Sequence, residues 1–373
     1  MAPLAESAYP LAALLERGWD VHVVSDGRDG AERGLAERLP IERLHVPRTS
    51  GSRPTRAQTA VAVGRGTHRR PLAYWRVVRS PSRRTRIARA RTIALAPQLM
   101  QVPSPQLAPA WSGVATAIGA RMVITLSSDD AIAMSFDDLH APLSASALHV
   151  ESEGVASLLN GAGPGSAVAV IPPVPDPLLL DERPAAPPPG GPLRILGVGP
   201  LSWTQGFEHA LLAVKLLDER GVACQYRIAG RGEYRDAISF AGHQLGLGNR
   251  VEMIEPRSRA ELRDQFRWAS VLMDASVATT SPKPILDAHA SGVPVITTDR
   301  AAHGEAALGV RRRDPDGLCD ALTAIARDSV LRTGLAQAGR KRALQAPSEA
   351  EQARRFDDLY LAALAQRDSS RIA

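Results

Sequence analysis

A polar loop between two apolar runs carries side chains suited to binding an anion. Its hydroxyls and amides come from Thr279, Thr280 and Ser281. Lys283 adds a positive charge just before a helical pattern that begins near Pro284. The first turn of a helix attracts anions, because its free N–H groups carry partial positive charge. We therefore expect a diphosphate here, although the same residue types also cap helices without a ligand.

A glycine-flanked turn after another apolar run forms a second candidate anion site. Its candidate residues are Gly199, Gln205 and Gly206, and Arg231 follows the next apolar run. The turn differs from the dinucleotide-binding fingerprint, because Ser202 stands at the third glycine position and no acidic residue ends the next run. A nicotinamide cofactor is therefore not expected.

Two series of apolar runs predict the strands that must position these loops. The strands expected in the first half are Asp20–Ser25, Leu99–Val102, Arg121–Leu126, Ala147–Glu151 and Ala167–Ile171. Those expected in the second half are Leu193–Val198, Cys224–Ala229, Val251–Ile254, Ser270–Asp274 and Val293–Thr297. Helix-length amphipathic segments separate them, and such alternation is typical of parallel sheets covered by helices. We expect an α/β fold with two Rossmann-like, doubly wound lobes.

The expected lobes are residues 1–172 and 193–348, joined by the proline-rich linker 173–192, in which regular structure is not expected. Residues 349–373 should pack back on the first lobe through a final amphipathic helix. The first lobe opens on a helical pattern, where a doubly wound lobe normally opens on a strand and a glycine-rich turn. Its first βα unit should therefore be missing, either through a gene start placed too far downstream or through real loss.

Composition excludes several classes of protein. The chain has 373 residues, a net charge of +6 and two cysteines, so neither a disulfide scaffold nor a thiolate zinc site is expected. It shows no signal-peptide pattern and no apolar run long enough to span a bilayer. We expect a cytoplasmic protein, at most peripheral at the inner face of the membrane.

Ten arginines crowd the segment Arg65–Arg91. An anionic membrane surface, a phosphate-bearing acceptor or plain solvent would each suit such a face, and these alternatives stay open. Nucleic acid is not expected, because aromatic residues make up 4% of the chain.

No metal site is expected. Asp314 and Asp316 flank a proline at the start of a helical pattern and are typical of a cap. The adjacent pairs Asp129–Asp130 and Asp137–Asp138 lack spaced partners that could complete a metal-ligand set.

The order of elements from Leu193 to Leu344 resembles the C-terminal domain of family 4 glycosyltransferases, especially the exopolysaccharide or colanic-acid type. The resemblance runs through LRILGVGPLSWTQGFEHALLAVKLL, YRIAGRGEY and PILDAHASGVPVITTD, and more loosely through LAALLERGWDVHVVS. It implies a GT-B fold, with two lobes facing a cleft. It also implies retaining, metal-independent transfer of a sugar from a nucleotide-diphosphate sugar to a saccharide or lipid-linked acceptor, without a cofactor.

The resemblance also implies specific site residues, and this sequence departs from them. Pro200 stands where the family has an arginine and Gln205 where it has a lysine, while Thr279 and Asp287 stand at two glutamate positions. Asp287, near the ribose, alone keeps its charge, and Asp130 is the candidate catalytic residue. These degenerate motifs leave an alternative open: a non-catalytic GT-B relative that serves as partner or scaffold of an active transferase.

Overall fold

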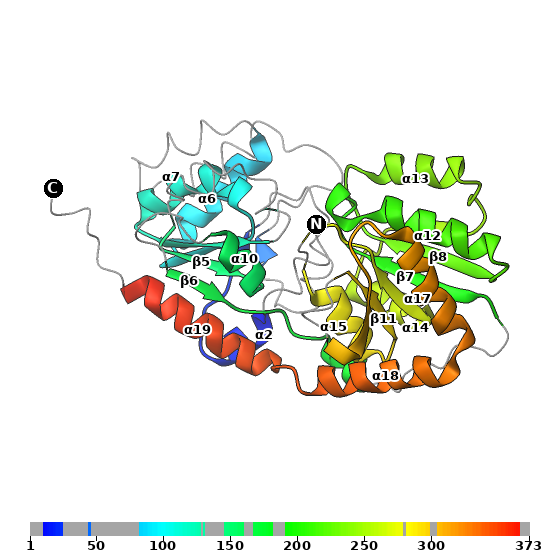
Figure 1. Cartoon of the computed structure of the whole chain (residues 1–373). Coiled ribbons are helices and arrows are strands. Elements are labelled where there is room, and N and C mark those ends of the chain that lie inside the picture. The colour runs from blue at the N-terminus through cyan, green and yellow to red at the C-terminus, as the bar shows by residue number, and fades with distance from the viewer. Residues whose placement is uncertain are drawn as a thin grey trace. The chain divides into compact units, whose positions relative to one another are not determined.

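The computed structural model describes residues 10–24, 44–45, 82–127, 130, 145–159, 167–181, 191–278, 281–298 and 304–365. The chain divides into two compact units (Figure 1). The N-terminal lobe comprises Leu4–Pro172 together with Glu349–Ala373, and the C-terminal lobe comprises Pro173–Ser348.

The C-terminal lobe is built on a six-stranded parallel sheet. Its strands are β7 (Leu193–Val198), β8 (Cys224–Ala229), β9 (Val251–Ile254), β10 (Val271–Asp274), β11 (Val295–Thr297) and β12 (Ala307–Gly309). The spatial order is β12-β11-β10-β7-β8-β9, which corresponds to the doubly wound order 3-2-1-4-5-6. The order reverses between β7 and β10. In such sheets ligands bind outside the carboxyl ends of the strands at this reversal.

Helices and short 3₁₀ turns connect these strands. They are α11 (Pro177–Asp181), η4 (Trp203–Gln205), α12 (Phe207–Glu219), α13 (Arg235–Gln244), α14 (Arg259–Trp268), α15 (Lys283–Ala290), η5 (Gly304–Ala306), α17 (Pro315–Arg327) and α18 (Ser329–Leu344). Helix α12 buries Leu211, Val214 and Leu217 at helical spacing, so one apolar stripe faces the sheet. It also packs against α17, while α15 packs against α18 and α11.

The N-terminal lobe has a four-stranded parallel sheet in sequential order. Its strands are β3 (Leu99–Val102), β4 (Arg121–Leu126), β5 (Ala147–Val150) and β6 (Ala167–Val170), and a separate pair joins β1 (Val23–Val24) to β2 (Leu44–His45). Its helices are α2 (Leu11–Glu16), α6 (Arg83–Leu95), η3 (Pro105–Leu107), α7 (Ala108–Ile118), α10 (Glu153–Leu158) and α19 (Glu349–Ala365). Helix α19 packs against β4 and α2, where Phe356 joins a cluster with Leu14 and Val123.

The structure confirms the α/β fold and most predicted strands, because buried parallel strands leave near-continuous apolar runs in the sequence. The expectation for the linker was wrong at Pro177–Asp181, where α11 forms. Leu179 is 2% exposed, and Asp176 Oδ1 accepts a hydrogen bond from the N–H of Leu178, so packing and an aspartate at its start stabilise this short helix. The opening residues 1–9 lie outside the described residues, so the missing βα unit stays a prediction.

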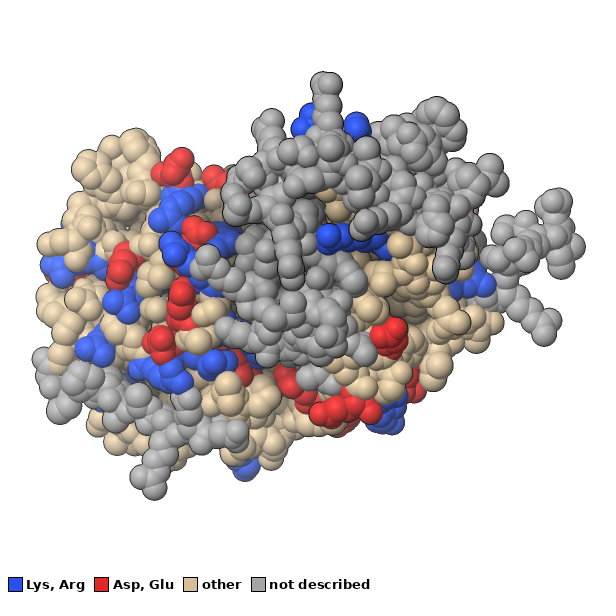
Figure 2. All heavy atoms as spheres, turned by 180° about the vertical axis from the view of Figure 1, so that it is seen from behind, with Lys and Arg blue, Asp and Glu red and all other residues tan. Residues whose placement is uncertain are grey.

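The arginine-rich segment is described in part. Arg83, Arg86, Arg89 and Arg91 lie on α6, and residues 65–80 are outside the described ranges. Figure 2 shows basic and acidic side chains interspersed on the face it presents. None of the helices in the described part of the chain has the length and apolar content needed to cross a bilayer.

Candidate functional site

The turn after β7 is tightly packed. Gly206, with φ of +61°, caps α12, and a Cβ atom there would lie 2.1 Å from the carbonyl oxygen of Ala275. Gln205 is 8% exposed, and a Cβ atom on Gly199 would lie 2.4 Å from its Oε1. The Gln205 amide therefore folds back onto Gly199, within the turn itself.

The turn after β8 lies beside the turn after β7. The backbone N–H of Leu201 donates to the carbonyl of Arg231 over 2.7 Å, and that of Tyr234 donates to the carbonyl of Leu201 over 3.1 Å. The Arg231 guanidinium pairs with Glu255, with Nε 2.6 Å from Oε1. Arg231 is thus at the predicted edge of the sheet but already has an acidic partner.

The loop after β10 completes this edge. The N–H of Val277 donates to the carbonyl of Thr204 over 2.9 Å, which joins the loops after β10 and β7 at the point where the strand order reverses. The Asp274 carboxylate accepts hydrogen bonds from Ser276 and, at 2.7 Å, from Thr297 Oγ1. Ser281 belongs to the same loop, and Thr279 and Thr280 lie outside the described residues.

Lys283 and Asp287, both predicted to contact a ligand, form an ion pair with each other. They lie one turn apart on α15, and each is 4% exposed. Lys283 Nζ donates to both carboxylate oxygens of Asp287, at 2.5 Å to Oδ2. Burial raises the pKa of Asp287, and the nearby Lys283 ammonium partly offsets this. Lys283, whose charge was predicted to face a diphosphate, thus pairs with a carboxylate of its own helix.

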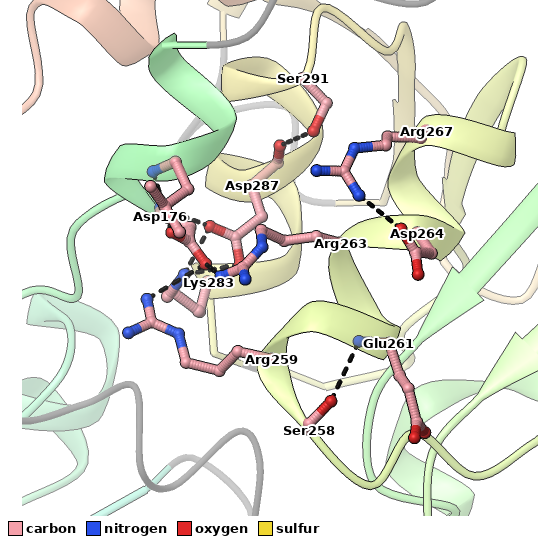
Figure 3. Close-up of polar contacts among 11 residues, drawn as sticks. Asp176, Ser258, Arg259, Glu261, Arg263, Asp264, Arg267, Lys283, Asp287 and Ser291 are labelled. Carbon is pink, nitrogen blue, oxygen red and sulfur yellow. Dashed lines mark hydrogen bonds and ion pairs between the residues drawn. The ribbon is translucent and has the colours of Figure 1, made fainter. Parts of the chain in front are cut away.

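Asp176 extends this pair into a larger group that the sequence analysis missed. Its backbone N–H donates to Asp287 Oδ1 over 2.8 Å. Its own Oδ2 lies 3.2 Å from a terminal nitrogen of Arg259 and 3.3 Å from one of Arg263. Figure 3 shows these side chains converging from α14, α15 and the segment before α11. We call these five residues the charge cluster.

The cations of the charge cluster set the ionisation of Asp176. Burial alone would raise its pKa, but Arg259, Lys283, the N–H of Leu178 and Arg263 together hold that pKa below its usual value. Asp176 is therefore a carboxylate at neutral pH. A proline-flanked aspartate in an apparent linker carries no sequence signal for such a role.

Asp130, the candidate catalytic residue, lies in the N-terminal lobe and is 2% exposed. Its Oδ1 accepts from Ser104 Oγ over 3.0 Å, and its Oδ2 accepts from Ser127 Oγ over 2.7 Å and from the Ser127 N–H over 3.2 Å. Both oxygens are thus engaged in fixing the loop after β4.

The predicted cap at the start of α17 is confirmed, because Asp314 Oδ1 accepts from the N–H of Gly317 over 2.9 Å. Across the described ranges, no group of three or more His, Cys, Asp or Glu side chains is placed to hold a metal ion.

Comparisons with known proteins agree with this architecture. Residues 192–328 match the family model described as Glycosyl transferases group 1, which confirms the predicted resemblance for that stretch. WcaL of Escherichia coli K12, assigned to colanic acid biosynthesis as a glycosyltransferase, is 31% identical over 116 residues. The aligned stretch is 30% of this chain and 29% of WcaL. The uncharacterised glycosyltransferase MJ1607 of Methanocaldococcus jannaschii is 31% identical over 104 residues, which are 28% of this chain and 26% of that protein.

Solved structures match nearly the whole chain and show that its fold is GT-B. The complex of HepE from Anabaena with UDP and glucose superposes with a TM-score of 0.67 at 15% identity, covering 96% of each chain. A glycosyltransferase from Rickettsia africae gives a TM-score of 0.63 at 14% identity, covering 98% of this chain and 96% of that one.

Proposed function

We propose that this protein is a glycosyltransferase that transfers a sugar from a nucleotide-diphosphate sugar to a saccharide or lipid-linked acceptor. The observation that carries the proposal is the family match over residues 192–328, which includes the loops after β7, β8 and β10 at the carboxyl edge of the C-terminal sheet. The HepE complexes with UDP and with UDP-glucose support a nucleotide-sugar donor. Transfer is proposed to be retaining and independent of metal.

The donor is proposed to bind at the carboxyl edge of the six-stranded sheet. The turn Gly199–Gly206, Arg231 and the loop Thr279–Lys283 would surround its diphosphate. Fixed N–H groups and cations there would stabilise charge as the diphosphate leaves, which is often the largest catalytic contribution. A contact of Asp287 with the ribose requires its pair with Lys283 to open.

Titration calorimetry with a panel of UDP- and GDP-sugars tests this proposal. We expect micromolar to millimolar affinity for at least one sugar nucleotide. Arg231→Gln should weaken it by about tenfold, the loss expected for one charged hydrogen bond. Arg227→Gln is the matched control, because Arg227 lies on β8 and pairs with Glu252. If the folded protein showed no heat of binding with any sugar nucleotide, the proposal would be contradicted.

The engaged state of the candidate cations favours a second function, that of a non-catalytic partner or scaffold of an active transferase. Lys283 and Arg231 both have acidic partners, and the neutral Gln205 turns inward. This alternative predicts co-purification with a paired transferase whose turnover rises when this protein is added. Sugar transfer by the isolated chain would rule it out. Contact of Arg65–Arg91 with an anionic membrane stays a prediction.

A further inference from the structure

The charge cluster does not balance its own charges. It holds three cations, Arg259, Arg263 and Lys283, against the carboxylates of Asp176 and Asp287, which leaves one positive charge in excess. The side chains of Lys283 and Asp287 are 5% exposed, and that of Asp176 is 6% exposed. An unbalanced charge in such a place is unfavourable unless a counter-ion compensates it.

Among the members of the charge cluster, the two arginines are the most accessible to solvent. Their side chains are 14% and 16% exposed, about three times as much as those of Lys283 and Asp287. Arg259 and Arg263 lie one turn apart on α14 and reach the same oxygen of Asp176, each through one terminal nitrogen. A guanidinium has five N–H donors, so this shared anchor fixes both groups while most of their donors are not used by Asp176.

We propose that Arg259 and Arg263, held side by side by Asp176, bind a phosphate or diphosphate group of a ligand. Planar guanidinium groups recognise phosphoryl oxygens through paired hydrogen bonds, and the excess positive charge of the cluster favours an anion. The phosphoryl group belongs either to the nucleotide-sugar donor or to a phosphate-bearing lipid-linked acceptor. That identity rests on the proposed function, whereas anion binding itself does not.

Calorimetry with inorganic pyrophosphate tests the proposal directly. Arg259→Gln and Arg263→Gln should each weaken binding at least tenfold. Arg267→Gln should leave it unchanged, because Arg267 lies on the same helix but pairs with Asp264. Urea unfolding shows whether each variant is folded before its affinity is compared. Arg259→Lys and Arg263→Lys, which keep the charge of the cluster, are the second variants, and they too should bind pyrophosphate less tightly, because lysine cannot form the paired hydrogen bonds of a guanidinium.

Competition experiments identify the source of the phosphoryl group. Displacement of pyrophosphate by UDP-glucose assigns the site to the donor. Displacement by farnesyl phosphate, with UDP-glucose bound at the same time, assigns it to a lipid-linked acceptor. Equal pyrophosphate affinity in the native chain, Arg259→Gln and Arg263→Gln would overturn the inference.

The inference and the proposed function fail separately. Binding of UDP-glucose without binding of pyrophosphate would support the proposed function and contradict the anion site at the two arginines. Binding of pyrophosphate through the two arginines without binding of any sugar nucleotide would support the anion site and contradict the proposed function.

Discussion

Each lobe buries a polar network, and the two networks differ in charge. The C-terminal lobe buries the charge cluster, whereas the N-terminal lobe buries a neutral chain of hydrogen bonds across its sheet. In that chain Gln101 Nε2 donates to Thr125 Oγ1 over 2.7 Å, and Thr125 Oγ1 lies 3.0 Å from His149 Nδ1. His149 Nε2 lies 3.0 Å from the carbonyl oxygen of Ile171.

The hydrogen bonds of the neutral chain all run in one direction, from the Gln101 amide to the Ile171 carbonyl. A carbonyl can only accept, so His149 Nε2 carries the proton and Nδ1 accepts from Thr125. Burial lowers the pKa of His149 to about 4, although the Ile171 carbonyl opposes this, so the ring is neutral at pH 7. The neutral chain leaves no excess charge and serves to hold strands together. The charge cluster leaves one positive charge in excess, and the anion site proposed above in the C-terminal lobe rests on that excess.

Removing one partner from the charge cluster should have the largest effect. Lys283→Met leaves Asp287 buried without its cation, which typically costs about 3–5 kcal/mol. The matched control is Lys215→Met, because Lys215 and Glu219 have the same one-turn spacing on α12 but are 37% and 55% exposed. That change should cost about 0.5 kcal/mol or less. Urea unfolding at pH 7 measures both, and equal losses would show that burial of the pair is unimportant.

The neutral chain should instead respond to pH. His149 has a folded pKa of about 4 and an ordinary value of 6.5, so the unfolded chain takes up a proton first as pH falls. The stability contributed by neutral His149 is complete above pH 6.5 and is lost as pH falls toward 4. The loss amounts to roughly 3 kcal/mol, at about 1.4 kcal/mol for each pH unit between the two values.

The difference in unfolding free energy between the native chain and His149→Gln isolates this effect, because other titrating groups cancel. We expect this difference to decrease as pH is lowered from 7 to 4, because only the native chain loses the stability of the neutral ring. A pH-independent difference for His149→Gln would contradict the buried neutral ring.

Removing one hydrogen-bonding group from the neutral chain should lower the unfolding free energy least. Thr125→Val keeps the shape of the side chain but removes the hydroxyl between Gln101 and His149, at about 1–2 kcal/mol for the groups left unpaired. Thr116→Val on α7 is the control, since its exposed hydroxyl bonds to the Ser112 carbonyl of its own helix. If Thr125→Val lowered the unfolding free energy as much as Lys283→Met does, the distinction between the neutral chain and the charge cluster would be contradicted.

The sequence predicted the strands of the two sheets better than the contacts among the candidate site residues. Strands such as Leu193–Val198 are recognisable because they are apolar on both faces. The partner of Asp287 was predictable in principle, since Lys283 stands at the one-turn spacing that favours ion pairs. Asp176 was not, because it lies 111 residues from Asp287 and only the folded chain brings them together.

Hydrogen–deuterium exchange with and without UDP-glucose would locate the bound donor on the chain. We expect slower exchange in the presence of UDP-glucose at residues 199–206, 230–234 and 275–283, the three loops at the carboxyl edge of the six-stranded sheet. Protection confined to other segments, or unchanged exchange at ligand concentrations that saturate the calorimetric signal, would contradict it.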